Sequence, residues 1–157
     1  MGTSERPQPA PGYVPVPPPL FDVNRASGDE GLDRLARAVL ESAFEVHRTL
    51  GSGLLQSTYE ACLAYELAFR GLPFERRKTL ALCYKGEALA QSDEVNLVVD
   101  NILVVQPLAW GAILPVHEAQ LLSQLRLGAW PLGLLIDFGG VRLGEGIRRL
   151  VLSRHSK

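Results

Sequence analysis

The sequence predicts an α/β layered domain, because its hydrophobic period changes from helical to strand-like and back along the chain. Apolar residues recur every three or four positions over residues 32–47 and again over residues 55–70, which is the spacing of amphipathic helices. Residues 79–105 alternate or form short apolar runs, as strands do, and the helical period returns over residues 114–127. The predicted order is α-α-β-β-β-α-β with a final basic segment, and elements in such an order pack as layers.

Two helices open the domain. The first begins near Gly28-Asp29-Glu30, where acidic residues suit a helix N-terminus, and it stops at Gly51-Ser52-Gly53. The second starts at about Leu55 and ends at Gly71-Leu72-Pro73, because glycine and proline commonly end a helix.

The central segment predicts strands joined by tight turns. Residues 79–84 lead into a turn at Lys85-Gly86, and the runs 95–99 and 102–105 flank Asp100-Asn101. Asp-Asn tolerates the positive φ that a hairpin turn needs. Because the two runs are nearly all apolar, we expect this hairpin to be buried on both faces.

The last third of the chain predicts one helix and one further strand. Residues 114–127 form the helix, and residues 132–138 are a short apolar run suited to a buried strand. A last element, residues 147–152, carries Arg148 and Arg149.

The composition divides the chain into three parts. Residues 1–28 hold seven of the eleven prolines, so we expect a disordered tail of polyproline-II character. A docking peptide for a proline-reading partner is the alternative for this tail. Residues 29–153 form one domain, which is long enough for a proper core, and residues 154–157 form a C-terminal tail.

Charge and apolar content exclude several classes of protein. The net charge of −1 provides no overall field that attracts nucleic acid or an acidic membrane. No apolar run reaches the roughly 18 to 20 residues of a transmembrane helix, and the N-terminus lacks the pattern of a secretory signal, so we expect a cytoplasmic protein. Cys62 and Cys83 have no metal-ligand spacing and are expected to be small buried hydrophobic residues.

The hairpin is the place where chemistry is expected. Its turn brings Asn96 on one strand close to Gln106 on the next. Two carboxylates at these positions would form an oxygen site for Mg²⁺ or Mn²⁺. A lysine two residues after the second would lie on the same face, and this arrangement is usual for metal-dependent phosphodiester cleavage.

Several sequence blocks together carry a family resemblance. They are Val46-His47-Arg48-Thr49-Leu50-Gly51, Gly53-Leu54-Leu55-Gln56-Ser57-Thr58-Tyr59, Tyr84-Lys85-Gly86, His117-Glu118-Ala119-Gln120-Leu121-Leu122 and Gly133-Leu134-Leu135-Ile136-Asp137-Phe138-Gly139. The chain resembles the GxxExxY proteins, a branch of the PD-(D/E)xK nuclease superfamily, over about residues 32–152. The resemblance implies a restriction-endonuclease-like core, a mixed β-sheet flanked by helices. Its name motif falls on Gly53, Gln56 and Tyr59, and position 137, usually asparagine in the family, is aspartate here.

The resemblance also shows which active-site residues are missing. Where the family has the glutamate of its name motif, the hairpin aspartate, and the glutamate and lysine of the ExK strand, this chain has Gln56, Asn96, Gln106 and Leu108. Pro107 removes a backbone donor between the last two. The helix glutamine associated with the site is kept as Gln120, whereas the tyrosine four residues later is Gln124.

These replacements predict a site without metal or turnover. Up to three negative charges are lost, and Mg²⁺ sheds water reluctantly without carboxylates. Losing a charge-stabilising group such as the lysine commonly costs about 10²- to 10³-fold in rate. We therefore expect no Mg²⁺ or Mn²⁺ cofactor, and we expect the amides of Gln56, Asn96 and Gln106 to hydrogen-bond to one another.

Relocated ligands are the alternative. Glu94 shares a strand face with Asn96, and Glu60 lies one helical turn after Gln56. Asp93, Asp100, Glu118 and Asp137 also lie near the relevant elements. We interpret each of these acids as a solvated surface acid or a turn residue.

The remaining polar and aromatic residues have ordinary interpretations. His47 and His117 lack a second ligand at suitable spacing, so we expect capped or packed histidines. Trp110 and Trp130 are expected in the core or an interface. The basic residues either form solvated faces or make a stripe that contacts nucleic acid without cutting it: Arg76, Arg77, Lys78, Arg148 and Arg149.

Three functions are compatible with the sequence. The leading one is a catalytically inactive nuclease-like domain that acts as a protein-interaction or scaffold module, with another protein or itself as partner and no membrane. The second is a nucleic-acid-binding protein that does not cleave. The third is a metal-dependent nuclease with relocated acidic ligands.

Overall fold

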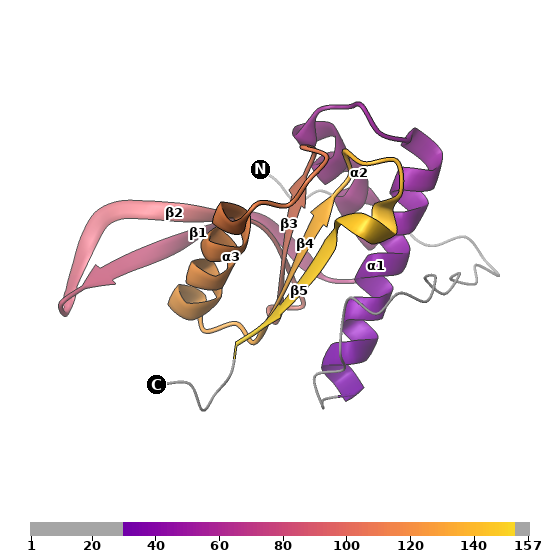
Figure 1. Cartoon of the computed structure of the whole chain (residues 1–157). Helices are drawn as coiled ribbons and strands as arrows, with labels where there is room; N and C mark the ends of the chain where they lie inside the picture. The colour runs from indigo at the N-terminus through magenta and orange to yellow at the C-terminus, as the bar shows by residue number, and fades with distance from the viewer. Residues whose placement is uncertain (1–29, 153–157) are drawn as a thin grey trace.

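The structure, a computed structural model, describes residues 30–152. The tails assigned above to residues 1–28 and 154–157 lie outside the described residues. The described part is an α/β domain in which a mixed five-stranded sheet lies between helices (Figure 1). The fold class predicted from the sequence is therefore confirmed.

The order of elements also follows the prediction, and the basic segment after the fourth strand is a fifth strand. The elements are α1 (Glu30–Leu50), α2 (Gln56–Phe69), β1 (Phe74–Tyr84), β2 (Glu87–Val99), β3 (Leu103–Leu108), α3 (Pro115–Gly128), β4 (Leu132–Asp137), the short 3-10 helix η1 (Leu143–Gly146) and β5 (Ile147–Val151). Among residues 30–152, no helix is both long and apolar enough to cross a membrane.

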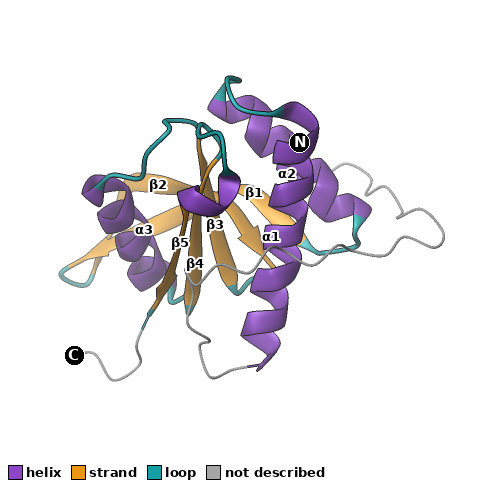
Figure 2. Cartoon of the chain, turned by 45° about the vertical axis from the view of Figure 1, so that its right-hand side comes forward, coloured by secondary structure: helices purple, strands orange, loops and turns teal. Residues whose placement is uncertain are grey.

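The strands lie in the order β1-β2-β3-β4-β5, and every neighbouring pair except β3–β4 is antiparallel. A parallel pair needs a crossover connection, and α3 forms it between β3 and β4. The helices α1 and α2 cover one face of the sheet and α3 covers the other (Figure 2).

The strands at the centre of the sheet are buried on both faces, as the sequence predicted. Leu97 and Val105 pack in the core beneath α1 and α2, while Val98 and Val104 pack in the core beneath α3. Side chains alternate between the faces of a strand, so apolar residues at successive positions fill both cores.

Both predicted turns are present. Asp100 and Asn101 have φ values of 54° and 56°, and the Ile102 N–H donates to the Val99 carbonyl at 3.0 Å. Lys85 has φ 53° and is followed by Gly86 at 82°. Two successive residues with positive φ match the twist of the strands that they join.

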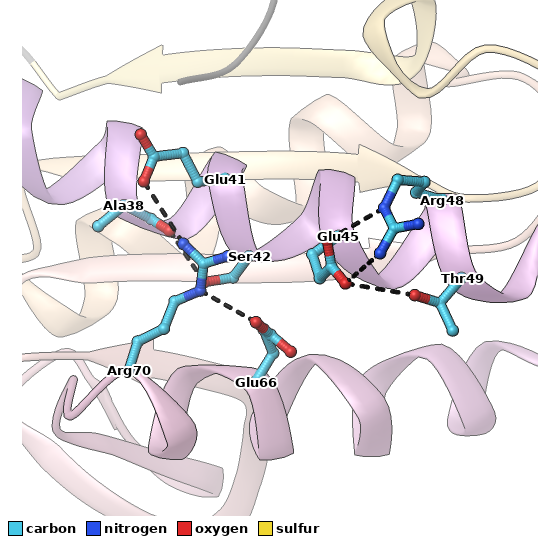
Figure 3. Close-up of polar contacts among 8 residues, drawn as sticks. All are labelled: Ala38, Glu41, Ser42, Glu45, Arg48, Thr49, Glu66 and Arg70. Atoms are coloured by element: carbon cyan, nitrogen blue, oxygen red, sulfur yellow. Dashed lines mark hydrogen bonds and ion pairs between the residues drawn. The ribbon is translucent and has the colours of Figure 1, made fainter. Parts of the chain in front are cut away.

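Charged side chains join the two helices on the first face (Figure 3). Arg70, at the end of α2, reaches Glu41 of α1 at 3.4 Å and Glu66 of its own helix at 3.1 Å. All three side chains are largely buried. On the exposed side of α1, a hydrogen bond from Arg48 lowers the pKa of the Glu45 carboxyl.

The strands β1 and β2 are longer than the sequence predicted. β1 begins at Phe74 rather than near Thr79, and β2 begins at Glu87 rather than near Val95. Only the end of β2 pairs with β3, from Leu97 onward. The earlier part of β2 pairs with β1 alone, and together they form a two-stranded projection, residues 79–94, which we call the arm. The tip of the arm extends past α3 (Figures 1 and 2).

The arm leaves the sheet at a distortion of the β1–β2 pair. Arg76 pairs with Leu97 and Lys78 with Val95, whereas Arg77 between them has φ 53°. Leu97 packs under α1 and α2, but Val95 packs under α3. The β1–β2 ribbon is therefore strongly twisted at this point, so that side chains two residues apart on β2 lie on opposite faces of the sheet.

Candidate functional site

Asn96 occupies the junction between the sheet and the arm. The β2–β3 ladder ends at the pair Leu97 and Val105. Extending this register by one residue would set the backbone of Asn96 opposite that of Gln106, but in the described part of the chain no hydrogen bond joins their side chains. The two residues lie just beyond the point where β2 stops pairing with β3.

The side chain that meets Asn96 is a buried carboxylate, Glu60 of α2. Asn96 Nδ2 donates to Glu60 Oε1 at 3.0 Å. Arg76 Nη2 lies 3.3 Å from Glu60 Oε2, and Arg77 Nε lies 3.9 Å from the same oxygen. We call these four residues the junction cluster; α2, β1 and β2 each contribute to it.

The surroundings of Glu60 contradict its interpretation as a solvated acid. Only 2% of Glu60 is exposed. It lies on the face of α2 that also buries Leu63, Ala64 and Leu67. The spacing 60, 63, 64, 67 is that of a buried helical face, so the position was readable from the sequence once the helix was placed.

The expected hydrogen bonding among the three amides is wrong. Among residues 30–152, Gln56, Asn96 and Gln106 do not hydrogen-bond to one another: Asn96 donates to Glu60, and the buried Gln106 Oε1 has no hydrogen-bond partner. A carboxylate accepts a stronger hydrogen bond than an amide oxygen. Glu60 therefore binds the amide that was expected to join its neighbours.

Leu108 has become part of the apolar core. It is 3% exposed and packs with Leu121 and Leu125 beneath α3. Pro107 lies in register with Ile136 of the parallel ladder, at a point where β3 no longer pairs with β2. The missing N–H of Pro107 therefore removes no donor from a β2–β3 ladder.

The two helix glutamines differ. Gln120 is exposed, whereas Gln124 is buried, and its Nε2 lies 3.5 Å from the Glu94 carbonyl. Gln124 thus links α3 to the base of the arm, in the position where the family resemblance expects tyrosine.

The glycine and tyrosine of the name motif have structural roles. Gly53 has φ 106°, a conformation that side chains rarely allow. The Tyr59 hydroxyl donates to the Gly51 carbonyl and accepts from the Leu54 N–H. Its ring stacks on Phe138 with 4.7 Å between centroids. The motif therefore fixes the α1–α2 loop against Phe138, the residue that follows β4.

A sequence model of the PD-(D/E)XK nuclease superfamily matches residues 33–150, which is most of the described domain. This chain belongs to the PD-(D/E)XK nuclease superfamily. The superfamily assignment made from the sequence blocks is confirmed. No curated protein and no solved structure matches the chain.

A second buried carboxylate of this superfamily member holds a loop together. Asp137 is 2% exposed. Its Oδ1 accepts the backbone N–H groups of Trp110, Gly111 and Gly139 at 2.9 to 3.1 Å. Asp137 is the buried last residue of β4, so its interpretation as a solvated acid or turn residue was wrong; its side chain instead binds the backbone of the adjoining loops.

The other acids named above follow the expected pattern. Asp93, Glu94 and Asp100 are exposed, and Glu118 forms a surface ion pair with Arg148. Among residues 30–152, no group of three His, Cys, Asp or Glu side chains is arranged to hold a metal ion.

Both histidines of the nuclease-like domain are packed, in agreement with the sequence interpretation. His117 Nδ1 accepts the Leu114 N–H at the start of α3, and its ring meets Trp110 edge-on. His47 Nε2 lies 3.0 Å from the Gly140 carbonyl. Trp130 is in the core, while Trp110 is 66% exposed.

The cysteines only partly match the expectation. Cys62 is half-buried, but Cys83 is exposed. Cys83 lies on the arm, where no second layer covers that face, so its small apolar side chain did not indicate burial.

The basic residues do not form one stripe. Arg76, Arg77 and Lys78 lie on β1, and Arg148 and Arg149 lie on β5, the opposite edge of the sheet. Lys78 pairs with Glu75, Arg148 with Glu118, and the buried Arg149 with Asp33. Only Arg76 and Arg77 lie at the junction cluster.

Proposed function

We propose that this protein is a catalytically inactive nuclease-like domain of the GxxExxY branch that serves as an interaction module. The proposal has two parts. The first is the loss of metal-dependent phosphodiester cleavage, and the second is the retention of the fold for binding.

The observation that supports inactivity is the ion pairing of Glu60. A divalent cation needs several oxygen ligands, mainly carboxylates. The junction cluster offers one carboxylate, and two guanidinium groups already face it. Because Arg76 and Arg77 repel a cation, these residues do not fit Mg²⁺ or Mn²⁺.

The missing lysine gives independent support. The stabilising cation of the ExK strand would have to come from position 108, and Leu108 is packed among leucines beneath α3. Arg76 is engaged by Glu60. No cation remains on β3 to stabilise a phosphate during attack.

Cleavage assays test this part directly. Plasmid DNA and single-stranded and structured RNA are incubated with the full chain in Mg²⁺ or Mn²⁺. We expect substrates to stay intact. Cleavage that is lost in Glu60→Gln, but kept in the surface control Glu118→Gln, would support relocated ligands and overturn the proposal.

Exposed apolar residues after β3 support a protein partner. Trp110 is 66% exposed, Leu114 39% and Val116 56%. Large apolar side chains left exposed close together in the sequence are frequent at protein contacts. The Trp110 ring contacts the His117 ring edge-on, and tryptophan is frequent among binding hot spots.

A pull-down from the native host tests the binding part with matched variants. We expect Trp110→Ser with Val116→Ser to lose specific partners, and Leu127→Ser, at a residue 49% exposed on α3, to retain them. Identical captured proteins for all three baits would contradict a binding role for this surface.

Nucleic-acid binding without cleavage is the second candidate. Arg76 and Arg77 keep 38% and 58% of their side chains exposed beside Glu60, so the site carries more positive than negative charge. Mobility shifts with a salt titration test this candidate. It requires binding that falls steeply with salt and weakens in Arg77→Ala but not in Arg148→Ala on the opposite edge.

A further inference from the structure

The loop between β3 and α3, residues 109–114, is held at both ends by side chains that accept backbone N–H groups (Figure 1). At its start, Asp137 Oδ1 accepts the N–H groups of Trp110 at 2.9 Å and Gly111 at 3.1 Å. At its end, His117 Nδ1 accepts the Leu114 N–H at 2.9 Å. The two acceptors differ in chemistry, because this imidazole nitrogen accepts a hydrogen bond only while it carries no proton.

The hydrogen bond to Leu114 identifies the protonation state of His117. A backbone N–H can only donate, so Nδ1 carries no proton and the proton of the neutral ring is on Nε2. In a protonated imidazole both ring nitrogens carry hydrogen. Protonation of His117 would therefore point Nδ1–H at the Leu114 N–H, and this hydrogen bond would be lost.

The position of His117 makes its protonation unfavourable for two further reasons. Only 6% of His117 is exposed, and burying a charge without a partner is costly. His117 also lies in the first turn of α3, and the positive end of the helix dipole disfavours a cation there. Both effects act in the same direction as the lost hydrogen bond.

The charged groups around His117 do not provide it with a counter-ion. They lie on α3 itself and on the strands beside it: Lys78, Glu94, Glu118, Arg126, Asp137 and Arg148. In the part of the chain that the structure describes, none of them forms an ion pair with His117. Glu118 pairs with Arg148 at the surface, and Asp137 binds the backbone N–H groups of the adjoining loops.

We propose that His117 is a pH-sensitive contact, which holds residues 109–114 against α3 while it is neutral and releases them when it takes up a proton. Trp110 and Leu114 lie on this loop and are 66% and 39% exposed. The rings of Trp110 and His117 are in contact, with 5.1 Å between centroids. Release of the loop would therefore rearrange this apolar surface. The inference concerns the loop itself and does not depend on a partner or on the loss of catalysis.

His47 provides an internal comparison, because its hydrogen bond has the opposite requirement. His47 Nε2 lies 3.0 Å from the Gly140 carbonyl. A carbonyl can only accept, so Nε2 carries the proton in this bond. Protonation of the other ring nitrogen leaves the bond in place, and we expect His47 to tolerate acid where His117 does not.

Nitrogen NMR of the imidazole rings in the full chain tests the proposal without any variant. At pH 7.5 we expect a neutral His117 with its proton on Nε2. Between pH 7.5 and 5.5, the backbone signals of residues 109–114 should shift as His117 becomes protonated. A proton on Nδ1 at pH 7.5, a ring that stays neutral throughout, or a protonated His117 with an unchanged Leu114 signal would overturn the proposal.

A glutamine variant separates the titration of His117 from its hydrogen bond. His117 is the third residue of α3 after the N-cap, and glutamine at this position can accept the same N–H without titrating. In urea denaturation, we expect the folding equilibrium constant of the wild type to fall about threefold or more from pH 7.5 to 5.5, relative to His117→Gln. Stability falls with pH because the unfolded state binds a proton that the closed loop excludes.

The matched control is His47→Gln, whose stability should fall between pH 7.5 and 5.5 as that of the wild type does. The same pH dependence in the wild type and in His117→Gln would contradict the proposal. A fall that disappears in His47→Gln but persists in His117→Gln would contradict it as well, because the titration would then belong to the other histidine.

Discussion

Glu60 shows how a single residue decides the chemistry of this site. A buried carboxylate is costly unless hydrogen bonds and opposite charge surround it. Asn96 and Arg76 supply these partners to separate oxygens of Glu60. An amide at position 96 can donate to a carboxylate, whereas an aspartate there would repel it. An amide at position 96, where the family resemblance implies a metal-binding aspartate, and the ion pair of Glu60 with Arg76 are therefore mutually consistent.

This argument predicts that Glu60 contributes to folding. Glu60→Ala leaves Asn96 Nδ2 and Arg76 without their acceptor, and we expect a loss of about 2 kcal/mol in the free energy of unfolding. Glu60→Gln keeps an acceptor for Asn96, so about half of that loss is expected. Urea denaturation measures both. Glu118→Ala, in an exposed pair with Arg148, serves as control with an expected change below about 0.5 kcal/mol. Equal effects of Glu60→Ala and Glu118→Ala would contradict the buried role.

Tyr59 yields a second prediction at this scale. Tyr59→Phe keeps the stacking on Phe138 but removes both hydrogen bonds of the hydroxyl with the α1–α2 loop. We expect a loss of about 1 to 2 kcal/mol in unfolding free energy. Tyr65→Phe, at an exposed position, should stay within about 0.5 kcal/mol. An unchanged denaturation midpoint for Tyr59→Phe would show that the motif tyrosine does not tie down the loop.

Between elements, α1 and α2 are joined by charge as well as by apolar packing. Arg70 lies between Glu41 and Glu66 with 8% of its side chain exposed (Figure 3). Breaking a buried ion pair leaves uncompensated charge behind, which commonly costs about 3 to 5 kcal/mol.

We therefore expect Arg70→Ala to lower the unfolding free energy by about 3 kcal/mol. Arg48→Ala is the matched control, because Arg48 pairs with Glu45 on the exposed side of α1, and its denaturation midpoint should not move. Acidification provides a second check: Arg48 lowers the pKa of Glu45, so the small contribution of that pair is lost only as the pH falls through the lowered pKa. A larger destabilisation by Arg48→Ala than by Arg70→Ala would contradict the assignment.

Sequence patterns are sufficient to predict most of the helices and strands. Helices, turns and central strands follow from apolar periodicity and from Asp100-Asn101 and Lys85-Gly86, because burial selects apolar residues on each covered face. In the arm, apolar periodicity does not indicate where the strands begin and end. Residues 87–94 are exposed or polar, and a two-stranded ribbon needs no buried face to form its ladder, so no periodic signal marks the start of β2.

At the scale of the whole molecule, part of the candidate site could be predicted from the sequence and part depends on how the layers pack. The burial of Leu108 in an apolar strand followed from the sequence. The partner of Asn96 did not, because contact between α2 and β2 depends on how the layers pack. For the same reason, the sequence could not show that Arg76 is paired with Glu60 while Arg148 lies at the far edge of the sheet.

The domain has a nuclease-like fold, and its junction cluster carries more positive than negative charge. A metal-dependent site gathers carboxylates, whereas the junction cluster has one carboxylate facing two guanidinium groups.

Calorimetric titration of Mn²⁺ into the full chain tests the central claim most directly. The account predicts no saturable binding to the wild type. It predicts that Gln56→Glu with Asn96→Asp and Gln106→Glu, which restores three carboxylates, gains Mn²⁺ binding, further strengthened by Arg77→Ala. Saturable binding to the wild type that disappears in Glu60→Gln would contradict the account.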